Sequence, residues 1–364
     1  MKSRTPHIQT VSLHMRNCLL CDKNPADETG SHIVPHFLMK RIDNEVGTRA
    51  RDKELGFRIT QDTTESYFGS AVLPEKLEEV YGEVTDEVIE NNKIDGIVDN
   101  YFCKRCEKRF GTFESEYSKS LNKNTSISEN YISEKRPFLS FLFWASIIWR
   151  LSIQDDSGFK LKLKEENKLR RILDKYLVLE INELTIDKYD SDLSDIGYKV
   201  VRSPNFSDKY STWLHWSPYY ERPYSLIIDE YLIFFYFKKS YLKGMVKEFY
   251  GSEKFKNQAD FNTPFSEEKI YGIAHEDYQI ISENIAQLGA RKRIENLSWK
   301  LDMIHQRLGG KGKQMYPEYK NEIMKRIANS EEVLAKKGTK EEYIKIIVDT
   351  IDELNNTWAN KELR

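Results

Sequence analysis

The chain has 364 residues and a formal net charge of −2, and 39% of its residues are hydrophobic. This length favours two domains, and the apolar content is large enough for buried cores, which excludes a wholly disordered chain. The balanced charge excludes nucleic-acid binding through bulk electrostatic attraction alone, so such binding would require a local basic patch or a bound metal ion.

The apolar segments indicate the cellular compartment of the protein, and the compartment in turn indicates whether its cysteines form disulfides or bind metal. The N-terminal residues contain no apolar stretch typical of a secretory signal. The longest apolar run, from Phe138 to Trp149, ends at Arg150 and is shorter than the roughly 20 residues that cross a bilayer. We therefore expect a cytoplasmic protein with no membrane partner. Stable disulfides are rare in that compartment, so the four cysteines favour metal binding.

The cysteines form two pairs within the first predicted domain, residues 1–125. Cys18 and Cys21 make one Cys-x-x-Cys motif, and Cys103 and Cys106 make the other. Each motif places two thiolates on one turn at the spacing that tetrahedral Zn²⁺ accepts, so two motifs complete a closed, structural Cys₄ site. A redox motif is the rival interpretation, although it needs only one pair and a thioredoxin-like context. Four unliganded buried thiols are the third alternative.

A long insert, residues 45–98, separates the two motifs. Residues 56–60 and 67–73 predict short strands, and the acidic segment 75–91 predicts a helix. Beyond the second motif, the polar residues 122–135 predict a linker.

Residues 136–364 predict a mixed α/β domain that ends in helices. Helices are expected at 138–152 and 165–176, strands at 198–202 and within 224–237, and helix again from 276 onward. The last helix has an apolar stripe at helical spacing, which suits either self-association or an internal helical bundle. The stripe consists of Tyr343, Ile347, Ile351, Leu354 and Trp358.

A basic segment lies in this helical region. Residues 289–340 contain 13 Lys and Arg against 6 Asp and Glu, a net charge of about +7. Arg291, Lys292 and Arg293 lie within it and are candidate contacts to a nucleic-acid backbone. One solvated face of a helix pair explains the same pattern equally well.

The residues around the cysteines resemble a known family. Ser31-His32-Ile-Val-Pro follows the first motif, and Glu107-x-x-Phe with Glu114 follows Cys106. This order, over residues 16 to about 120, resembles a Cys₄-zinc subgroup of HNH (ββα-metal) endonucleases. The resemblance implies an α+β fold in which zinc staples a hairpin to a helix. It also implies that His32 is the general base that deprotonates water.

The same resemblance implies a second metal site. Ser31, Glu107 and Glu114 match its ligand positions, and Asn100 is the candidate for orienting His32. The family commonly has a histidine directly after the last cysteine, and the carboxylate of Glu107 there favours a hard ion, Mg²⁺ or Mn²⁺, over zinc. Ser31 is a weaker ligand than the acidic residue found in many family members.

The function implied is metal-dependent cleavage of DNA, with RNA as an alternative, by a bacterial anti-phage effector. The second domain would then sense a signal, bind a protein partner or form a homo-oligomer. One alternative is a catalytically inactive, zinc-stabilised nucleic-acid-binding or scaffold protein. Another is a nuclease that cuts only when a partner or signal is bound to the C-terminal domain.

Overall fold

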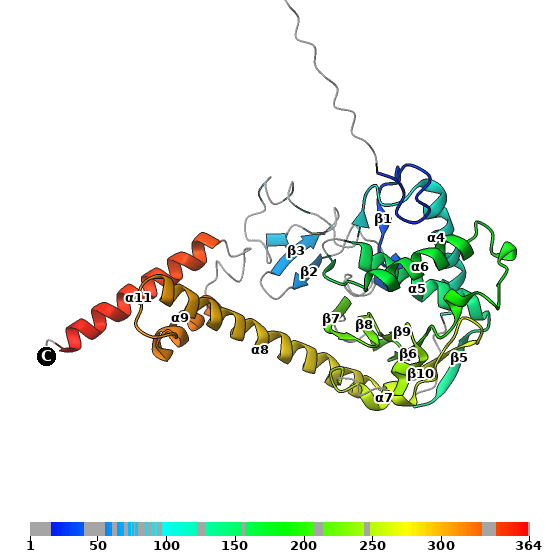
Figure 1. Ribbon diagram of the computed structural model, residues 1–364. Coiled ribbons are helices and arrows are strands. Elements are labelled where there is room, and N and C mark those ends of the chain that lie inside the picture. The colour runs from blue at the N-terminus through cyan, green and yellow to red at the C-terminus, as the bar shows by residue number, and fades with distance from the viewer. Residues whose placement is uncertain are drawn as a thin grey trace, which may run out of the picture.

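A computed structural model describes most of the chain, and it combines helices and strands, which confirms the α+β class (Figure 1). Besides isolated positions between 72 and 92, the described residues are 16–39, 55–59, 64–68, 97–121, 128–154, 157–206, 214–243, 248–329 and 340–362.

The N-terminal part of the fold is a short antiparallel ribbon followed by a helix. Its elements are β1 (Ser31–His32), α1 (His36–Met39), β4 (Ile97–Val98) and α4 (Lys104–Ser118). β1 pairs with β4 so that His32 lies opposite Ile97. The Asp27 carboxylate accepts a hydrogen bond from the Lys104 amide at 3.2 Å, which satisfies one free N–H at the start of α4. Residues before the insert and the last two residues of the insert thus meet in one ribbon, which α4 follows.

Within the insert, β2 (Leu55–Ile59) and β3 (Thr64–Phe68) form a separate antiparallel pair. β2 agrees with the strand predicted at 56–60, whereas β3 begins three residues before the strand predicted at 67–73. Most of the predicted acidic helix lies outside the described residues.

A six-stranded sheet forms the centre of the rest of the fold. Its strands are β5 (Asn130–Glu134), β6 (Gly197–Arg202), β7 (Leu214–Glu221), β8 (Tyr224–Ile228), β9 (Tyr231–Tyr236) and β10 (Glu268–Gly272). The order across the sheet is β5-β10-β6-β9-β8-β7, in which β10 and β6 are parallel and the other neighbours are antiparallel. β5 occupies residues that the sequence analysis assigned to the linker.

Both faces of this sheet are buried. Alternate residues of β9 belong to two different hydrophobic clusters, because successive side chains of a strand point to opposite faces. Those in the first cluster are Tyr231, Ile233 and Phe235, and those in the second are Leu232, Phe234 and Tyr236. Burial on both sides explains why the sequence of this region is an almost continuous apolar run.

Helices cover both faces. α5 (Pro137–Ile153) and α6 (Leu163–Tyr176) begin within two residues of the predicted positions and pack in the first cluster. The short helix α7 (Glu253–Gln258) and the start of α8 (His275–Arg307) pack on the second. The first cluster also contains Cys18, Cys106 and Phe110, so one continuous core joins the ribbon and α4 to the sheet.

A buried carboxylate marks this junction. Glu268 is fully buried on β10. It accepts hydrogen bonds from the Tyr117 hydroxyl of α4 at 2.8 Å and from the Trp144 indole of α5 at 2.7 Å. The Tyr198 hydroxyl of β6 donates a third bond at 3.0 Å. Burial raises the pKa of Glu268 to about 7, against the lowering effect of these three donors.

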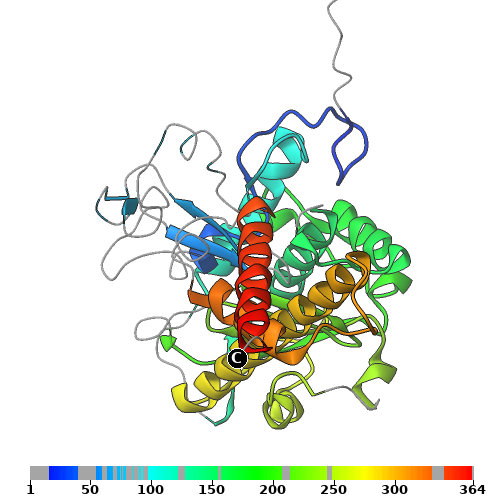
Figure 2. The same cartoon turned by 90° about the vertical axis from the view of Figure 1, so that its left-hand side faces the viewer.

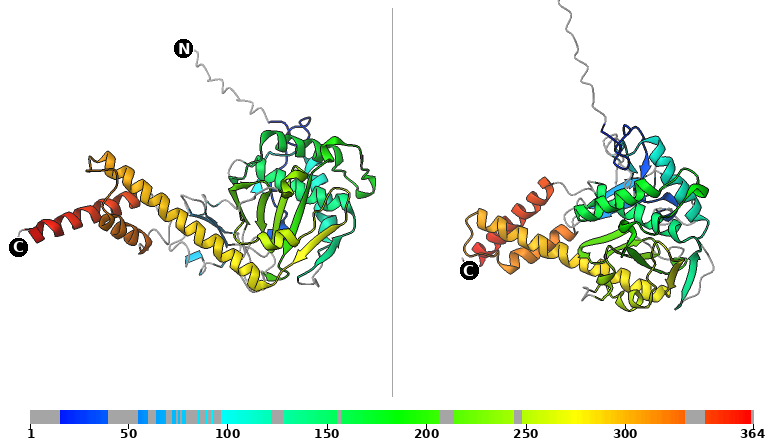
Figure 3. Two further views of the ribbon diagram at one scale, coloured as in Figure 1. Left: turned by 60° about the horizontal axis from the view of Figure 1, so that its bottom comes forward. Right: turned by 45° about the vertical axis from the view of Figure 1, so that its right-hand side comes forward.

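α8 leaves the body as a 33-residue helix and carries α9 (Pro317–Asn329) and α11 (Lys340–Glu362) near its far end (Figures 1 and 3). Figure 2 views the molecule from that side, with α11 in front of the body. Ile347 of α11 is buried in a small cluster between these helices, and Tyr343 and Ile351 pack against it. This part of the predicted stripe therefore lies in an internal bundle. Within the described residues, every helix is too short or too polar to cross a bilayer.

Candidate functional site

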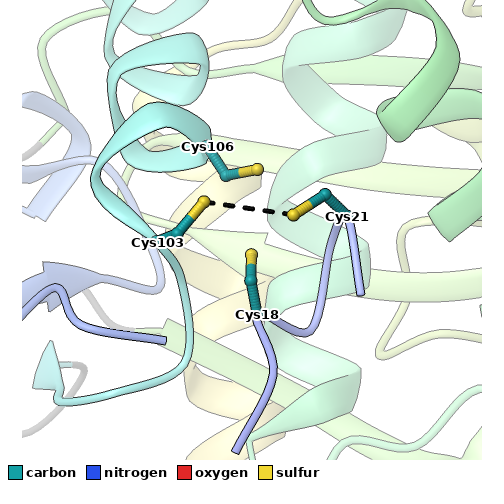
Figure 4. A group of neighbouring side chains, drawn as sticks. All are labelled: Cys18, Cys21, Cys103 and Cys106. Atoms are coloured by element: carbon teal, nitrogen blue, oxygen red, sulfur yellow. Dashed lines mark hydrogen bonds between the residues drawn. The ribbon is translucent and has the colours of Figure 1, made fainter. Parts of the chain in front are cut away.

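The two Cys-x-x-Cys motifs meet in one cluster (Figure 4). All four Sγ atoms lie within 4.8 Å of one another, and the Cys21 and Cys103 sulfurs are 4.0 Å apart. None of the four cysteines forms a disulfide. Zn–S bonds of about 2.3 Å in a tetrahedron separate the sulfurs by about 3.8 Å. The cluster therefore has the donor set, and nearly the size, that a structural zinc ion accepts.

Local backbone structure positions each motif. The first motif is a tight turn, in which the Asp22 amide donates to the Cys18 carbonyl at 2.8 Å. In the second motif, Cys103 is the N-cap of α4 and Cys106 lies in its first turn. The positive end of a helix favours thiolates, and so does a guanidinium. Arg109 supplies one, with Nη1 3.7 Å from the Cys106 sulfur.

The electrostatics of the cluster also favour a cation. The pKa of Cys18 is lowered to about 5, chiefly because the Cys106 thiol donates to its sulfur, and that same contact raises the pKa of Cys106. Ionisation of Cys18 thus opposes ionisation of Cys106. A divalent cation would hold all four as thiolates.

Arg150 connects the ribbon to α4. It is 1% exposed on α5, although it carries a charge. Its Nη1 donates to the main-chain carbonyl of His32 at 2.6 Å, and its Nη2 donates to Glu114 Oε1 at 2.6 Å. Its guanidinium also stacks over the Phe110 ring, 4.8 Å from the centroid. The backbone of the half-buried His32 on β1 is therefore held by a residue of α5.

Ser31, which directly precedes His32 on β1, lies close to Glu107 of α4. Ser31 is 1% exposed, and both its Oγ and Glu107 Oε2 are buried with no hydrogen-bond partner. Burial raises the pKa of Glu107, while Arg150 and the nearby Ser31 hydroxyl oppose that rise. The Ser31 hydroxyl thus lies close enough to Glu107 to lower the pKa of that carboxyl, although neither oxygen has a partner within the geometric limits of a hydrogen bond. Two unsatisfied buried oxygens are costly, and a bound cation or water would satisfy both.

The remaining predicted residues lie in different surroundings. Glu114 is the ion-pair partner of Arg150. Asn100 is exposed in the turn between β4 and α4, with φ of 60°, and its main-chain carbonyl accepts a bond from Arg16 at 2.6 Å. The basic residues Arg291, Lys292 and Arg293 lie along α8, away from the ribbon, and two of them are exposed.

Two charged residues beside the site were not singled out by the sequence analysis. They are Arg150 and Glu28. The charge of Arg150 lowers the pKa of Glu107, and the charge of Glu28 raises it. The signal for Arg150 was available, since a lone arginine at the end of a 12-residue apolar run must be buried against a partner. Glu28 gives no comparable signal, because a single acidic residue in a loop has no pattern that sets it apart.

Comparison of the chain with protein-family models, with curated proteins and with solved structures found no match. The functional argument therefore depends on the residues of the site themselves.

Proposed function

We propose that the chain is a metal-dependent endonuclease of the HNH type that cleaves DNA, with His32 as the general base. The main support is a pair of buried oxygens without a hydrogen-bond partner, Ser31 Oγ and Glu107 Oε2, of which Ser31 directly precedes His32 on β1. Further support comes from the two strands β1 and β4, which pair with one another and are followed by α4, because apart from α1 and the strands of the insert this is the order expected of a ββα-metal unit.

Each residue has a chemical task in this proposal. A neutral imidazole at position 32 accepts a proton from water near pH 7 without a large pKa shift. The bond from Arg150 to the His32 carbonyl fixes the ribbon that carries this imidazole. Ser31 and Glu107 offer oxygen donors to Mg²⁺ or Mn²⁺. Such an ion, when bound, neutralises charge on the scissile phosphate and the leaving oxygen.

The cysteine cluster has a structural task. A four-thiolate zinc site has no open position for water or substrate, so it cannot supply the chemistry. It would join the turn at Cys18 to the start of α4 and thereby fix Glu107, the residue that directly follows Cys106.

One observation favours a second candidate, an inactive zinc-stabilised binding protein or scaffold. Arg150 neutralises Glu114, which the family resemblance makes a metal ligand. Glu107 then remains the single unpaired carboxylate of the predicted ligand set. A site with one carboxylate and one serine binds Mg²⁺ weakly unless water and substrate phosphate complete the shell.

Cleavage of plasmid DNA with Mg²⁺ or Mn²⁺ tests the first proposal. We expect nicking or linearisation by the wild type and loss of cleavage by at least about 100-fold in His32→Ala. His305→Ala, on α8, is the matched control and should cut normally. Equal zinc content and circular dichroism spectra would show that the folds are intact. Metal-dependent cleavage by His32→Ala at the wild-type rate would contradict the proposal.

Calorimetric titration with Mn²⁺ separates the two candidates. A nuclease should bind Mn²⁺ at a site that Glu107→Ala removes and that Glu116→Ala leaves intact. Glu116 lies on the same helix but pairs with Lys119 and Arg136, so it is a control of equal charge. Absence of both cleavage and Mn²⁺ binding would favour the scaffold.

A further inference from the structure

A polar cavity of about 180 Å³ lies on the face of the sheet opposite α5, among β6, β9 and α7. It is distant in the fold from the cysteine cluster. Apart from one leucine, its walls are polar or charged side chains. They are Lys199, Tyr236, Tyr241, Glu253, Lys256 and Asn257.

Two lysines meet in this cavity. Lys199 Nζ donates to the main-chain carbonyl of Lys256 at 2.8 Å, and both side chains line the cavity. Lys256 is 5% exposed and is paired with Glu253. Among the described residues, Lys199 has no carboxylate within ion-pair distance, and Asp260 attracts it only from farther away.

The charges of the cavity are not balanced. With both lysines and Glu253 ionised, the walls carry a net charge of +1. The pKa of Lys199 is lowered by burial first and then by the positive charge of Lys256. Two ammonium groups that repel one another beside an open cavity are stabilised by an anion that binds near both.

We propose that this cavity binds a small phosphorylated ligand through its phosphate group, with Lys199, Lys256 and the Tyr236 hydroxyl as donors. Tetrahedral phosphate oxygens can accept from several directions at once, which suits point charges and hydroxyls arranged around a space. Tyr236 is 2% exposed, and burial raises its pKa, so its hydroxyl remains protonated and can donate.

The size of the cavity limits the ligand. At about 30 Å³ for each water molecule, it has the volume of about six waters. That volume holds a phosphate with a few further atoms, and it is below the range of roughly 300 Å³ and more that drug-sized ligands occupy. The ligand is thus free phosphate or a small phosphate ester. This proposal does not depend on the nuclease activity, because binding is measured without DNA.

Isothermal titration calorimetry of the full chain at low ionic strength tests the proposal. The probes are inorganic phosphate and ribose 5-phosphate, with sodium chloride at matched ionic strength as the blank. We expect saturable one-site binding of at least one probe, and the tighter of the two identifies free or esterified phosphate as the preferred form. Lys199→Gln should weaken binding by about tenfold or more.

Two further variants make the test specific. Lys254→Gln removes an equal charge from an exposed position on the same helix, where Lys254 pairs with Asp277, and should leave binding unchanged. Tyr236→Phe keeps both charges and should weaken binding severalfold. The melting temperature of each variant without ligand checks its fold. Non-saturable heats with both probes, or wild-type affinity in a folded Lys199→Gln, would overturn the proposal.

Discussion

Arg150 donates a 2.6 Å hydrogen bond to the main-chain carbonyl of His32, although 118 positions separate the two residues. The same guanidinium pairs with Glu114 and is 1% exposed. A helix that looks purely apolar in sequence therefore supplies the charged group that positions the candidate base. The site is consequently shared between the N-terminal unit and the helices that follow it.

Replacing this arginine should destabilise the whole fold. Arg150→Met leaves the Glu114 carboxylate unpaired and the His32 carbonyl without its donor. Breaking a buried pair in this way costs about 3 kcal/mol. Urea unfolding measures it. Arg136→Met is the control, because Arg136 is 46% exposed in its ion pairs and should cost about 1 kcal/mol or less. An equal decrease in the free energy of unfolding in the two variants would contradict the expectation that Arg150 contributes more to stability than Arg136.

The cysteine cluster predicts one zinc ion per chain. Elemental analysis of purified protein should find it, and Cys21→Ser and Cys106→Ser, one from each motif, should both lose it. Because the cluster joins the first turn to α4, both variants should also unfold at lower urea concentration. Full zinc occupancy in either variant would show that the four sulfurs do not form a single site.

Glu268 predicts a pH dependence of stability. Its folded pKa of about 7 lies above its ordinary value of 4.5, so the folded state holds a proton that the unfolded chain releases. The stability it contributes is therefore fully present below about pH 4.5 and is lost as the pH rises through 7. The loss is about 3 kcal/mol across that window.

Glu268→Gln should flatten this profile and unfold at higher urea concentration than the wild type at pH 8. Glutamine retains an oxygen for Trp144 and Tyr198 and can donate to the Tyr117 oxygen, so the hydrogen bonds survive. Glu267→Gln changes an exposed neighbour and should leave the profile unaltered. An unchanged pH profile in Glu268→Gln would show that a group other than Glu268 causes the pH dependence of stability.

The basic residues of α8 can be tested through salt dependence. If Arg291, Lys292 and Arg293 contact a nucleic-acid backbone, changing all three to Gln should weaken DNA binding for every sequence. The slope of log K against log salt should fall by up to about 3 for duplex DNA. Fluorescence anisotropy at several salt concentrations measures it. An unaltered slope would indicate that these three residues do not contact DNA and belong to a solvated face of the helix.

Local patterns predicted much of the fold. The Cys-x-x-Cys spacing identified all four residues of the cluster, because two thiols on one turn depend only on neighbouring backbone. The helix at 138–152 was predicted from the length of its apolar run. The strands within 224–237 were predicted because this segment is rich in β-branched and aromatic residues. The hairpin formed by β8 and β9 divides this last run at Asp229, where φ is 51°.

Long-range contacts could not be predicted in the same way. β5 was assigned to a linker because its residues are polar, yet its partner β10 lies more than 130 positions away. The contacts of Arg150 and Glu268 depend equally on which elements pack together. A single sequence contains the residues that take part in these contacts, but it gives no information on which of them meet.

The length of α8 has a mechanical consequence. Thirty-three residues span about 50 Å, and one end is fixed where the Tyr278 hydroxyl donates to the Asp229 carbonyl. A rotation of about 10° at that anchor displaces the distal end by about 9 Å. A rigid helix of this length would therefore turn a small rotation at its anchored end into a displacement of α9 and α11 by nearly the width of a helix.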